Sequence, residues 1–214
     1  MRYLIVCGGK IDKEFGLNEI KTDGIDAIIA ADSGMDFLYE NGVTPDIIVG
    51  DFDSTTTNAL EYFERKGQTE IHRLNPIKDD TDTEYAIRLA ISEGARSIVM
   101  LGATGSRIDH VLGNISLLGI GLESKTDISI IDTNNRIRMS DKPVTIEKSA
   151  QYGRFVSLIA VTDDNEVSLR GFKYPVTDYS FDRFTSLGIS NEIVDDHALI
   201  DIHRGKFIII ESKD

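Results

Sequence analysis

The sequence contains little cysteine, few basic residues and no long apolar run. Of its 214 residues one is a cysteine, Cys7, so a disulfide framework is excluded and a reducing cytoplasm fits. Cys7 lies in an apolar run, where a cysteine is ordinarily a small buried hydrophobe. That run is too short for a signal peptide, and no stretch approaches the roughly 20 apolar residues of a membrane helix. We therefore expect a cytoplasmic protein that does not enter a membrane.

Basic residues are outnumbered, since 23 Lys and Arg stand against 36 Asp and Glu, which gives a formal net charge of −13. Nucleic acid binding depends on many basic side chains that neutralise phosphates, so we expect no nucleic acid partner. A single nucleotide is not excluded, because Mg²⁺ can join acidic side chains to its phosphates.

The first part of the chain alternates short aliphatic runs with helical patterns. Aliphatic runs without polar alternation are typical of strands covered on both faces, and their alternation with helices predicts a mostly parallel α/β sheet. The predicted strands are Tyr3–Cys7, Ala27–Ala30, Ile47–Val49 and Ser97–Leu101. The predicted helices are Asp36–Glu40, Asn58–Lys66, Thr81–Glu93 and Ile108–Leu122.

After about Ile131 the segments become short and are separated by turn residues. We predict an α/β domain over residues 1–132 and a second, all-β domain over residues 133–214. The run IDIHRGKFIII resembles a hairpin whose turn is Arg204-Gly205. The predicted strands here are Phe155–Val161, Glu166–Arg170, Ala198–His203 and Lys206–Glu211.

Acidic residues follow several of the predicted strands. Ligands of open α/β sheets bind beyond the carboxyl ends of the strands, so these residues are candidates for a binding site. An aspartate at a strand-to-helix junction can equally be a helix cap, and Thr81 with Glu84 fits a capping box. Asp32 alone fits a cap as well as a ligand. The acidic candidates are Asp32, the pair Asp51 and Asp53, and the group Asp79, Asp80 and Asp82.

Asp51 and Asp53 are separated by one residue in the stretch IIVGDFDST. Two carboxylates so close repel each other unless something neutralises them. A metal ion or a protonated neighbour would do so, and we favour a metal.

The stretch GATGSRIDH, Gly102 to His110, follows a predicted strand and opens a predicted helix. Backbone N–H groups at a helix N-terminus favour phosphate, so this stretch is a candidate phosphate loop, although it also fits a simple tight turn. Arg107 and His110 are candidate phosphate contacts, with Asp109 between them. The stretch lacks the Gly-Lys-Ser/Thr of a P-loop.

DFDST also fits the aspartate-x-aspartate motif of haloacid dehalogenase-type phosphatases, in which Asp51 would be a nucleophile and Asp53 a general acid. That motif normally ends the first strand of its fold, whereas at least two predicted strands precede Asp51. We keep the phosphatase as an alternative hypothesis.

Taken together, the motifs resemble the thiamin pyrophosphokinase family. They occur in the family's order and cover nearly the whole chain. They are ADSG (31–34), PDIIVGDFDS (45–54), KDDTDTE (78–84), GATGSRIDHVLGN (102–114) and SLGISNE (186–192).

The resemblance implies that ATP and thiamin give AMP and thiamin diphosphate, with the thiamin hydroxyl attacking the β-phosphorus. It implies an N-terminal α/β domain, a C-terminal β-sandwich that binds thiamin, and a homodimer with thiamin near the subunit interface. A module that senses nucleotide or thiamin without catalysis is the third hypothesis, although every expected acidic position is filled.

The resemblance also implies roles for individual residues. Mg²⁺ would be held against the polyphosphate of ATP by Asp51, Asp53 and Asp82. Asp79 or Asp82 would accept the proton of the attacking hydroxyl. Ser190 and Asn191 would contact the thiamin pyrimidine. The expected nucleotide contacts are Asp32, Lys78, Thr104, Gly105, Arg107, Asp109 and His110.

The sequence departs from the family pattern in two places. It has no tryptophan, whereas some members stack an indole on thiamin, so the stacking partner is open. Ser106 stands where a glycine is common.

Overall fold

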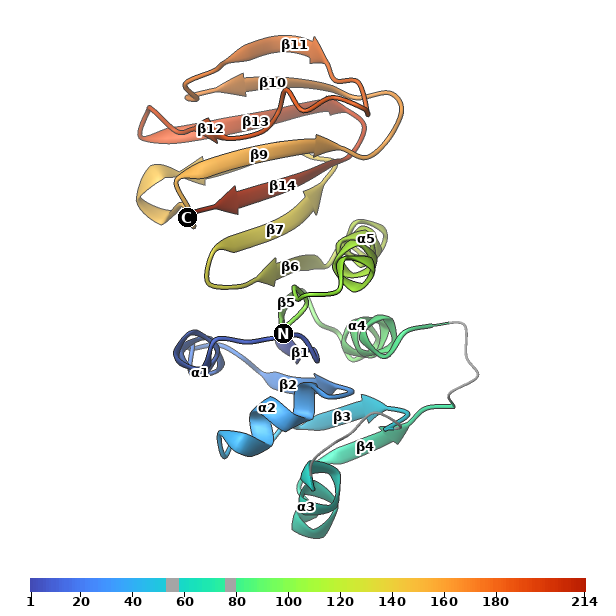
Figure 1. Ribbon diagram of the computed structural model, residues 1–214. Helices are drawn as coiled ribbons and strands as arrows, with labels where there is room; N and C mark the ends of the chain where they lie inside the picture. The colour runs from blue at the N-terminus through green and yellow to red at the C-terminus, as the bar shows by residue number, and fades with distance from the viewer. Residues whose placement is uncertain (53–57, 76–79) are drawn as a thin grey trace. The chain divides into compact units, whose positions relative to one another are not determined.

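The computed structural model describes residues 1–52, 58–75 and 80–214. The chain divides into two compact units, Met1–Thr133 and Asn134–Asp214. Figure 1 shows the helices of the first unit and the strands of the second. Within the described residues, no helix is long and apolar enough to cross a membrane.

The first unit contains a parallel sheet in the order β6-β5-β1-β2-β3-β4. Leu4 of β1 lies opposite Ile28 of β2 on one side and Val99 of β5 on the other. The central strands are almost wholly buried, because helices cover both faces of the sheet, and this explains their continuous aliphatic runs. The strands are β1 (Arg2–Val6), β2 (Ala27–Ala31), β3 (Ile47–Gly50), β4 (Glu70–Arg73), β5 (Ser97–Leu101) and β6 (Asp127–Ile131).

Five helices connect these strands within the described ranges. Side chains of α1, α2 and α3 share one core with residues such as Leu4 and Ile48, and α4 and α5 lie on the opposite side of the sheet (Figure 1). Thr81 accepts a hydrogen bond from the Glu84 N–H at 3.2 Å, so the predicted cap of α4 is confirmed. The helices are α1 (Lys13–Ile20), α2 (Gly34–Glu40), α3 (Ala59–Lys66), α4 (Asp82–Ser92) and α5 (Ile108–Ser124).

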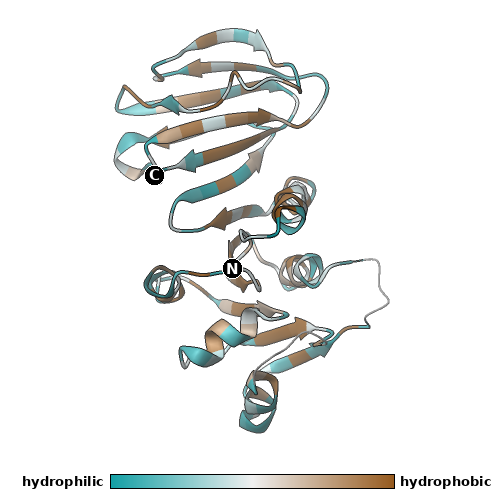
Figure 2. Ribbon diagram, in the orientation of Figure 1, coloured by the Kyte–Doolittle hydropathy of each residue, from teal (hydrophilic) through white to brown (hydrophobic). Residues whose placement is uncertain are grey.

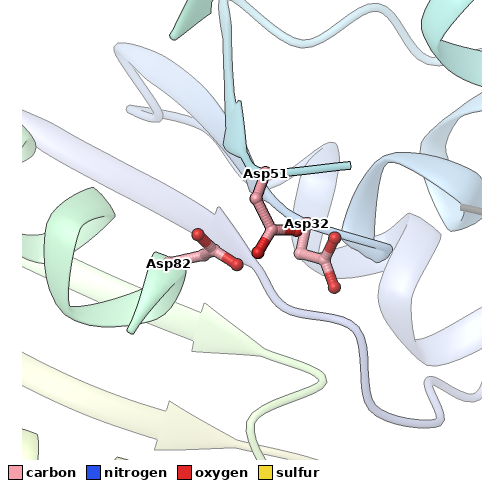
Figure 3. A group of neighbouring side chains, drawn as sticks. All are labelled: Asp32, Asp51 and Asp82. Atoms are coloured by element: carbon pink, nitrogen blue, oxygen red, sulfur yellow. The ribbon is translucent and has the colours of Figure 1, made fainter. Parts of the chain in front are cut away.

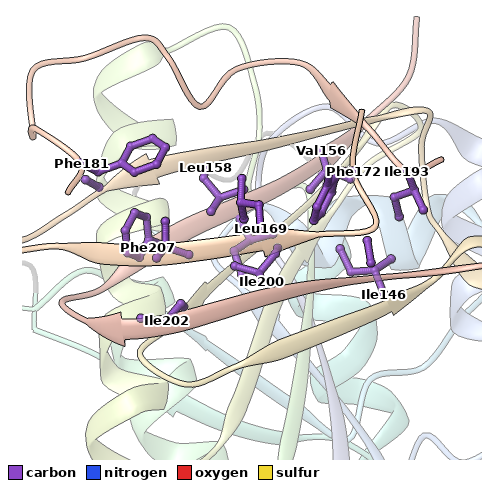
Figure 4. Close-up of a cluster of buried hydrophobic side chains, with 14 residues drawn as sticks. Ile146, Val156, Leu158, Leu169, Phe172, Phe181, Ile193, Ile200, Ile202 and Phe207 are labelled. Carbon is purple, nitrogen blue, oxygen red and sulfur yellow. The ribbon is translucent and has the colours of Figure 1, made fainter. Parts of the chain in front are cut away.

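The second unit consists of two antiparallel sheets, in the orders β12-β9-β14-β7 and β11-β10-β13-β8. Buried side chains from both sheets, among them Leu158, Leu169, Ile200 and Phe207, form one core between them (Figure 4). Its strands alternate in hydropathy, whereas those of the first unit are more uniformly apolar (Figure 2). The strands are β7 (Asn135–Ser140), β8 (Val144–Glu147), β9 (Phe155–Ala160), β10 (Glu166–Arg170), β11 (Val176–Ser180), β12 (Asn191–Glu192), β13 (His197–Arg204) and β14 (Phe207–Ser212), with a short helix η1 (Lys148–Ala150) after β8.

The second unit also contains a buried carboxylate. Glu211 is fully buried and accepts hydrogen bonds from Arg136 at 2.7 Å, from Arg138 at 3.0 Å and from the Tyr152 N–H at 2.9 Å. A buried charge is tolerated only when it is paired and hydrogen-bonded, and these partners meet that need.

The predicted fold class is confirmed, with a mostly parallel α/β region followed by an all-β sandwich. The prediction of a hairpin at Arg204-Gly205 is wrong. β13 pairs with β8 and β10, whereas β14 pairs with β7 and β9, so the chain crosses from one sheet to the other here. Two apolar runs joined by a glycine turn fit either arrangement, and the shared core between the sheets favours the crossing.

Candidate metal and phosphate site

Three carboxylates come together at the carboxyl edge of the parallel sheet. Asp32 follows β2, Asp51 follows β3 and Asp82 begins α4 (Figure 3). One oxygen from each lies within 4.8 Å of the other two, and all three residues are half-buried. We call these three residues the acid group.

Local backbone geometry brings Asp32 to Asp51. Asp32 has a φ of 49°, in the left-handed region that few residues other than glycine adopt. Its N–H donates to the carbonyl of Val49 at 2.8 Å, which ties the end of β2 to the end of β3. A Cβ at Gly50 would lie 3.3 Å from the Asp32 Cα, so glycine permits this close approach.

The acid group fits a small, hard cation. Mg²⁺ prefers oxygen ligands at about 2.1 Å, so two opposite ligands lie about 4.2 Å apart. The 4.8 Å within which the three oxygens lie is close to that span. Three carboxylates at this separation also repel one another unless a cation or protons neutralise them.

The acid group differs in one member from the predicted metal ligands. The structure brings Asp51 and Asp82 together as expected, and it adds Asp32, which the sequence analysis assigned to the nucleotide. The third predicted ligand, Asp53, lies outside the described residues, as do Lys78 and Asp79.

The predicted phosphate loop, Gly102–Arg107, joins β5 to α5 and is held in place by two side chains. The Thr104 hydroxyl donates to Asp132 Oδ2 at 2.8 Å, and the Asn114 amide donates to the carbonyl of Ala103 at 2.8 Å. Because the Thr104 hydroxyl hydrogen is used in this way, a phosphate would be met by backbone N–H groups of the loop rather than by that hydroxyl.

Asp132 and Asn114 were not assigned roles from the sequence. Asp132 directly follows β6, a strand that the sequence analysis did not identify. The rule that ligands gather at the carboxyl ends of strands would have drawn attention to it.

Arg107 and Asp109 bind each other at the start of α5. Arg107 Nη2 donates to Asp109 Oδ2 at 2.6 Å, and the His110 N–H donates to Asp109 Oδ1 at 3.0 Å. The Arg107 guanidinium lowers the pKa of Asp109, so this exposed carboxylate stays ionised. Part of the charge of Arg107 is therefore already matched within the chain.

The predicted thiamin contacts lie in the second unit. Ser190 is exposed and has a φ of 60°. Asn191 is buried, its side-chain Oδ1 accepts from the Tyr174 N–H at 3.0 Å, and its side-chain Nδ2 donates to the Tyr174 carbonyl at 2.9 Å. Asn191 thus holds the backbone of Tyr174.

Tyr174 was missed from the sequence. It is 62% exposed although it is a large aromatic residue. The ammonium of Lys173 lies 5.6 Å from its ring centroid and binds Glu192 at 2.9 Å. The hydrogen bond from Lys173 lowers the pKa of Glu192, and a hydrogen bond from Arg154 lowers it further. An exposed ring on a fixed backbone is suited to stacking on a flat ligand.

Comparison with known proteins gives the same assignment for both units. Residues 21–131 match the family described as "Thiamin pyrophosphokinase, catalytic domain", and residues 143–207 match "Thiamin pyrophosphokinase, vitamin B1 binding domain". The chain is 35% identical over 188 residues to thiamine pyrophosphokinase of Bacillus subtilis (strain 168), an alignment that covers 87% of each chain.

Solved structures agree with the sequence matches. The crystal structure of thiamine pyrophosphokinase from Bacillus subtilis superposes with a TM-score of 0.88 at 31% identity and covers 100% of both chains. That of thiamin pyrophosphokinase from Geobacillus thermodenitrificans gives a TM-score of 0.86 at 30% identity, covering 100% of this chain and 98% of the other. The chain therefore belongs to the thiamin pyrophosphokinase family.

Proposed function

We propose that the chain is a thiamin diphosphokinase that transfers the pyrophosphoryl group of ATP to the hydroxyl of thiamin. The observation that carries the proposal is the match of both units to the two thiamin pyrophosphokinase domains. The acid group and the phosphate loop at one sheet edge support it, because they are the kinds of group that hold a charged polyphosphate.

The reaction breaks one bond and forms one bond at the β-phosphorus of ATP. The thiamin hydroxyl oxygen attacks that phosphorus, the bond to the oxygen of the α-phosphate breaks, and AMP leaves with the electron pair. The hydroxyl proton passes to a base, for which Asp79 and Asp82 are the candidates. Positioning and charge neutralisation are the main tasks of the protein in such a transfer.

Asp32, Asp51 and Asp82 are the residues that would hold Mg²⁺, with Asp53 as a further candidate. Bound there, Mg²⁺ supplies positive charge to the oxygens of the polyphosphate. The acid group itself fixes where that charge can be placed, because its members are positioned by the ends of β2 and β3 and by the start of α4.

The phosphate loop would bind the nucleotide from the N-terminus of α5. Thr104 and Gly105 directly precede the N-terminus of α5, which is the positive end of the helix dipole, so backbone N–H groups from there onward are the candidate donors to phosphate. Arg107, Asp109 and His110 would lie beside the nucleotide, and the pairing of Arg107 with Asp109 holds the guanidinium in a defined place. Lys78 remains a candidate for neutralising the migrating group.

Thiamin would bind to the second unit at Ser190, with Asn191 acting through Tyr174. Because the chain has no tryptophan, an aromatic partner for thiamin must be tyrosine or phenylalanine. The exposed ring of Tyr174, held by Asn191, is the best-supported candidate.

A cytoplasmic homodimer belongs to the proposal. The segment that precedes and includes SLGISNE exposes Phe184 by 91%, Leu187 by 59% and Ile189 by 48%. Neighbouring exposed apolar side chains are typical of interaction surfaces.

Cys7 is buried, and burial raises its pKa to about 12, so its thiol is unreactive in a reducing or an oxidising compartment.

The proposal is tested by giving the purified chain ATP, MgCl₂ and thiamin, and separating the products by chromatography. We expect AMP and thiamin diphosphate in equal amounts. ADP as the nucleotide product would contradict transfer of the pyrophosphoryl group as one unit.

Two further measurements separate the other two hypotheses. A phosphatase would hydrolyse a simple phosphate ester without ATP. The position of Asp51 disfavours this hypothesis, because Asp51 follows the third strand of its unit and the phosphatase motif normally ends the first. A sensing module would bind both substrates in calorimetry and release neither product.

A further inference from the structure

The segment Cys7–Lys10, which follows β1, has no role in the reaction described above. β1 lies between β2 and β5, so the strand order reverses at this point of the sheet. Open α/β sheets bind ligands at such a reversal. The segment also precedes the stretch 21–131 that matches the catalytic domain.

One side of this segment lies beside the acid group. The Thr83 hydroxyl lies 3.8 Å from the Cys7 sulfur, and a Cβ built on Gly8 would come within 2.1 Å of the Ser33 Oγ. Thr83 and Ser33 are each the residue directly after a member of the acid group. Two of the three carboxylates are therefore next in sequence to residues that contact the segment.

The other side of the segment contacts the phosphate loop. The Gly9 N–H donates to the Gly102 carbonyl at 2.9 Å, and a Cβ on Gly9 would lie 2.6 Å from the Thr104 carbonyl oxygen. The Ile11 Cδ1 lies 3.1 Å from the position of a Cβ on Gly102. Both neighbours of Lys10 thus contact Gly102, which fixes the Lys10 backbone beside the loop.

A polyphosphate that reaches from the acid group to the phosphate loop must pass this segment, and it needs cations. Arg107, in the loop after β5, binds Asp109, and Arg73, the last residue of β4, binds Glu64. Lys10 is exposed, and within the described part of the chain no ion pair engages it. Its flexible four-carbon stem allows the ammonium to follow a phosphate oxygen.

We infer that Lys10 binds the polyphosphate of the nucleotide, between the acid group and the phosphate loop. The inference rests on the proposed function, because it takes a nucleoside triphosphate as the ligand. Lys10 supplies the positive charge that the acid group cannot supply, and Gly8 and Gly9 let the backbone that carries it lie close to both.

The test compares Lys10→Met, which removes the charge and keeps the stem, with Lys10→Arg and with Lys21→Met. Lys21 is an exposed lysine at the far end of α1, eight residues beyond the start of that helix. A non-hydrolysable ATP analogue is titrated into each variant by calorimetry, and kcat/KM is measured for ATP and for thiamin. Thermal unfolding confirms that each variant is folded.

We expect Lys10→Met to weaken binding of the analogue about 10- to 100-fold, the factor for one hydrogen bond to a charged group. kcat/KM for ATP should fall by a similar factor, KM for thiamin should stay within twofold, and Lys10→Arg should recover most of the loss. Analogue affinity within twofold of wild type in Lys10→Met, or an equal loss in Lys21→Met, would overturn the inference.

The calorimetric arm distinguishes failure of the inference from failure of the proposed function. If the wild-type chain makes no thiamin diphosphate but binds the analogue through Lys10, the function is wrong and the inference stands. If Lys10→Met makes thiamin diphosphate with the wild-type kcat/KM for ATP and binds the analogue as wild type does, the function stands and the inference is wrong.

Discussion

At the scale of single residues, the acid group brings three carboxylates so close that their negative charges repel one another unless a cation or protons neutralise them. Asp32, Asp51 and Asp82 place three half-buried carboxylates within 4.8 Å. Each ionised group raises the free energy of the other two, so their closeness is expected to serve a bound cation and not the stability of the fold.

Replacing one member by its neutral amide should separate these two effects. We expect Asp32→Asn, Asp51→Asn and Asp82→Asn each to lower kcat by about 10²- to 10⁴-fold, the scale for losing a contact to the charge of the transition state. Without Mg²⁺ the same variants should have a higher Tm than wild type, because one repelling charge is gone. Enzyme assays and thermal unfolding with and without MgCl₂ measure both.

Asp127→Asn is the matched control for these three variants. Asp127 is an exposed aspartate at the amino end of β6, whereas the acid group lies at the carboxyl edge of the same sheet. It should change neither kcat nor the response of Tm to MgCl₂. Near-normal rates in all three acid-group variants would remove the metal interpretation.

Tyr174 and Asn191 make a second prediction for single residues. Tyr174→Ser should raise KM for thiamin about 10-fold or more, because stacking on a ring contributes roughly 1–3 kcal/mol, and should leave KM for ATP unchanged. Asn191→Ala should also raise KM for thiamin and should in addition lower Tm, because two backbone groups of Tyr174 lose their partners.

Tyr174→Phe is the control, since it keeps the ring. Its KM for thiamin should remain close to that of wild type. If Tyr174→Ser binds thiamin normally, another aromatic residue must stack on the ligand.

At the scale of elements, the segment after β1 and the phosphate loop are held together by glycine contacts. A Cβ on Gly9 would lie 2.3 Å from the Gly102 carbonyl oxygen, closer than side-chain and backbone atoms approach. Because a Cβ is fixed to its own Cα and the oxygen is a backbone atom, no side-chain rotation can relieve the clash, and one element must move away from the other.

Gly9→Ala should therefore lower Tm. It should also reduce kcat/KM for ATP under conditions in which the variant is still fully folded. Gly113→Ala is a contrasting variant, because a Cβ there meets nothing within 4 Å and the residue lies inside α5. It should stabilise the chain by about 1 kcal/mol through helix propensity. Equal stability of the two variants in denaturant unfolding would show that the packing at Gly9 is loose.

At the scale of the whole molecule, the proposed dimer gives an exposed apolar segment a partner. Phe184→Asp should shift the molecule from two-chain to one-chain mass in light scattering, and it should raise KM for thiamin. Thr22→Asp adds the same charge at an exposed position of the first unit and should do neither. A wild-type chain that is monomeric at assay concentrations would contradict the proposed dimer.

Much of this molecule was predictable from local patterns in the sequence. Aliphatic runs gave β1, β2, β3 and β5, and the Thr81 cap placed the start of α4, because burial and capping act over a few residues. β4 and β6 were not identified. β4 is a short edge strand of partly exposed polar residues, Glu70–Arg73, so it lacks the apolar signal.

By itself, the sequence determined the two-part architecture, the family and the edge of the sheet at which acidic residues gather, since these follow from apolar periodicity and from motifs in order. The tertiary structure alone decided that Asp32 joins Asp51 and Asp82, that β13 and β14 belong to opposite sheets, and that Asn191 holds Tyr174. Each of these depends on which distant segments become neighbours. That choice is made by packing and pairing over the whole unit, which no short stretch of sequence encodes.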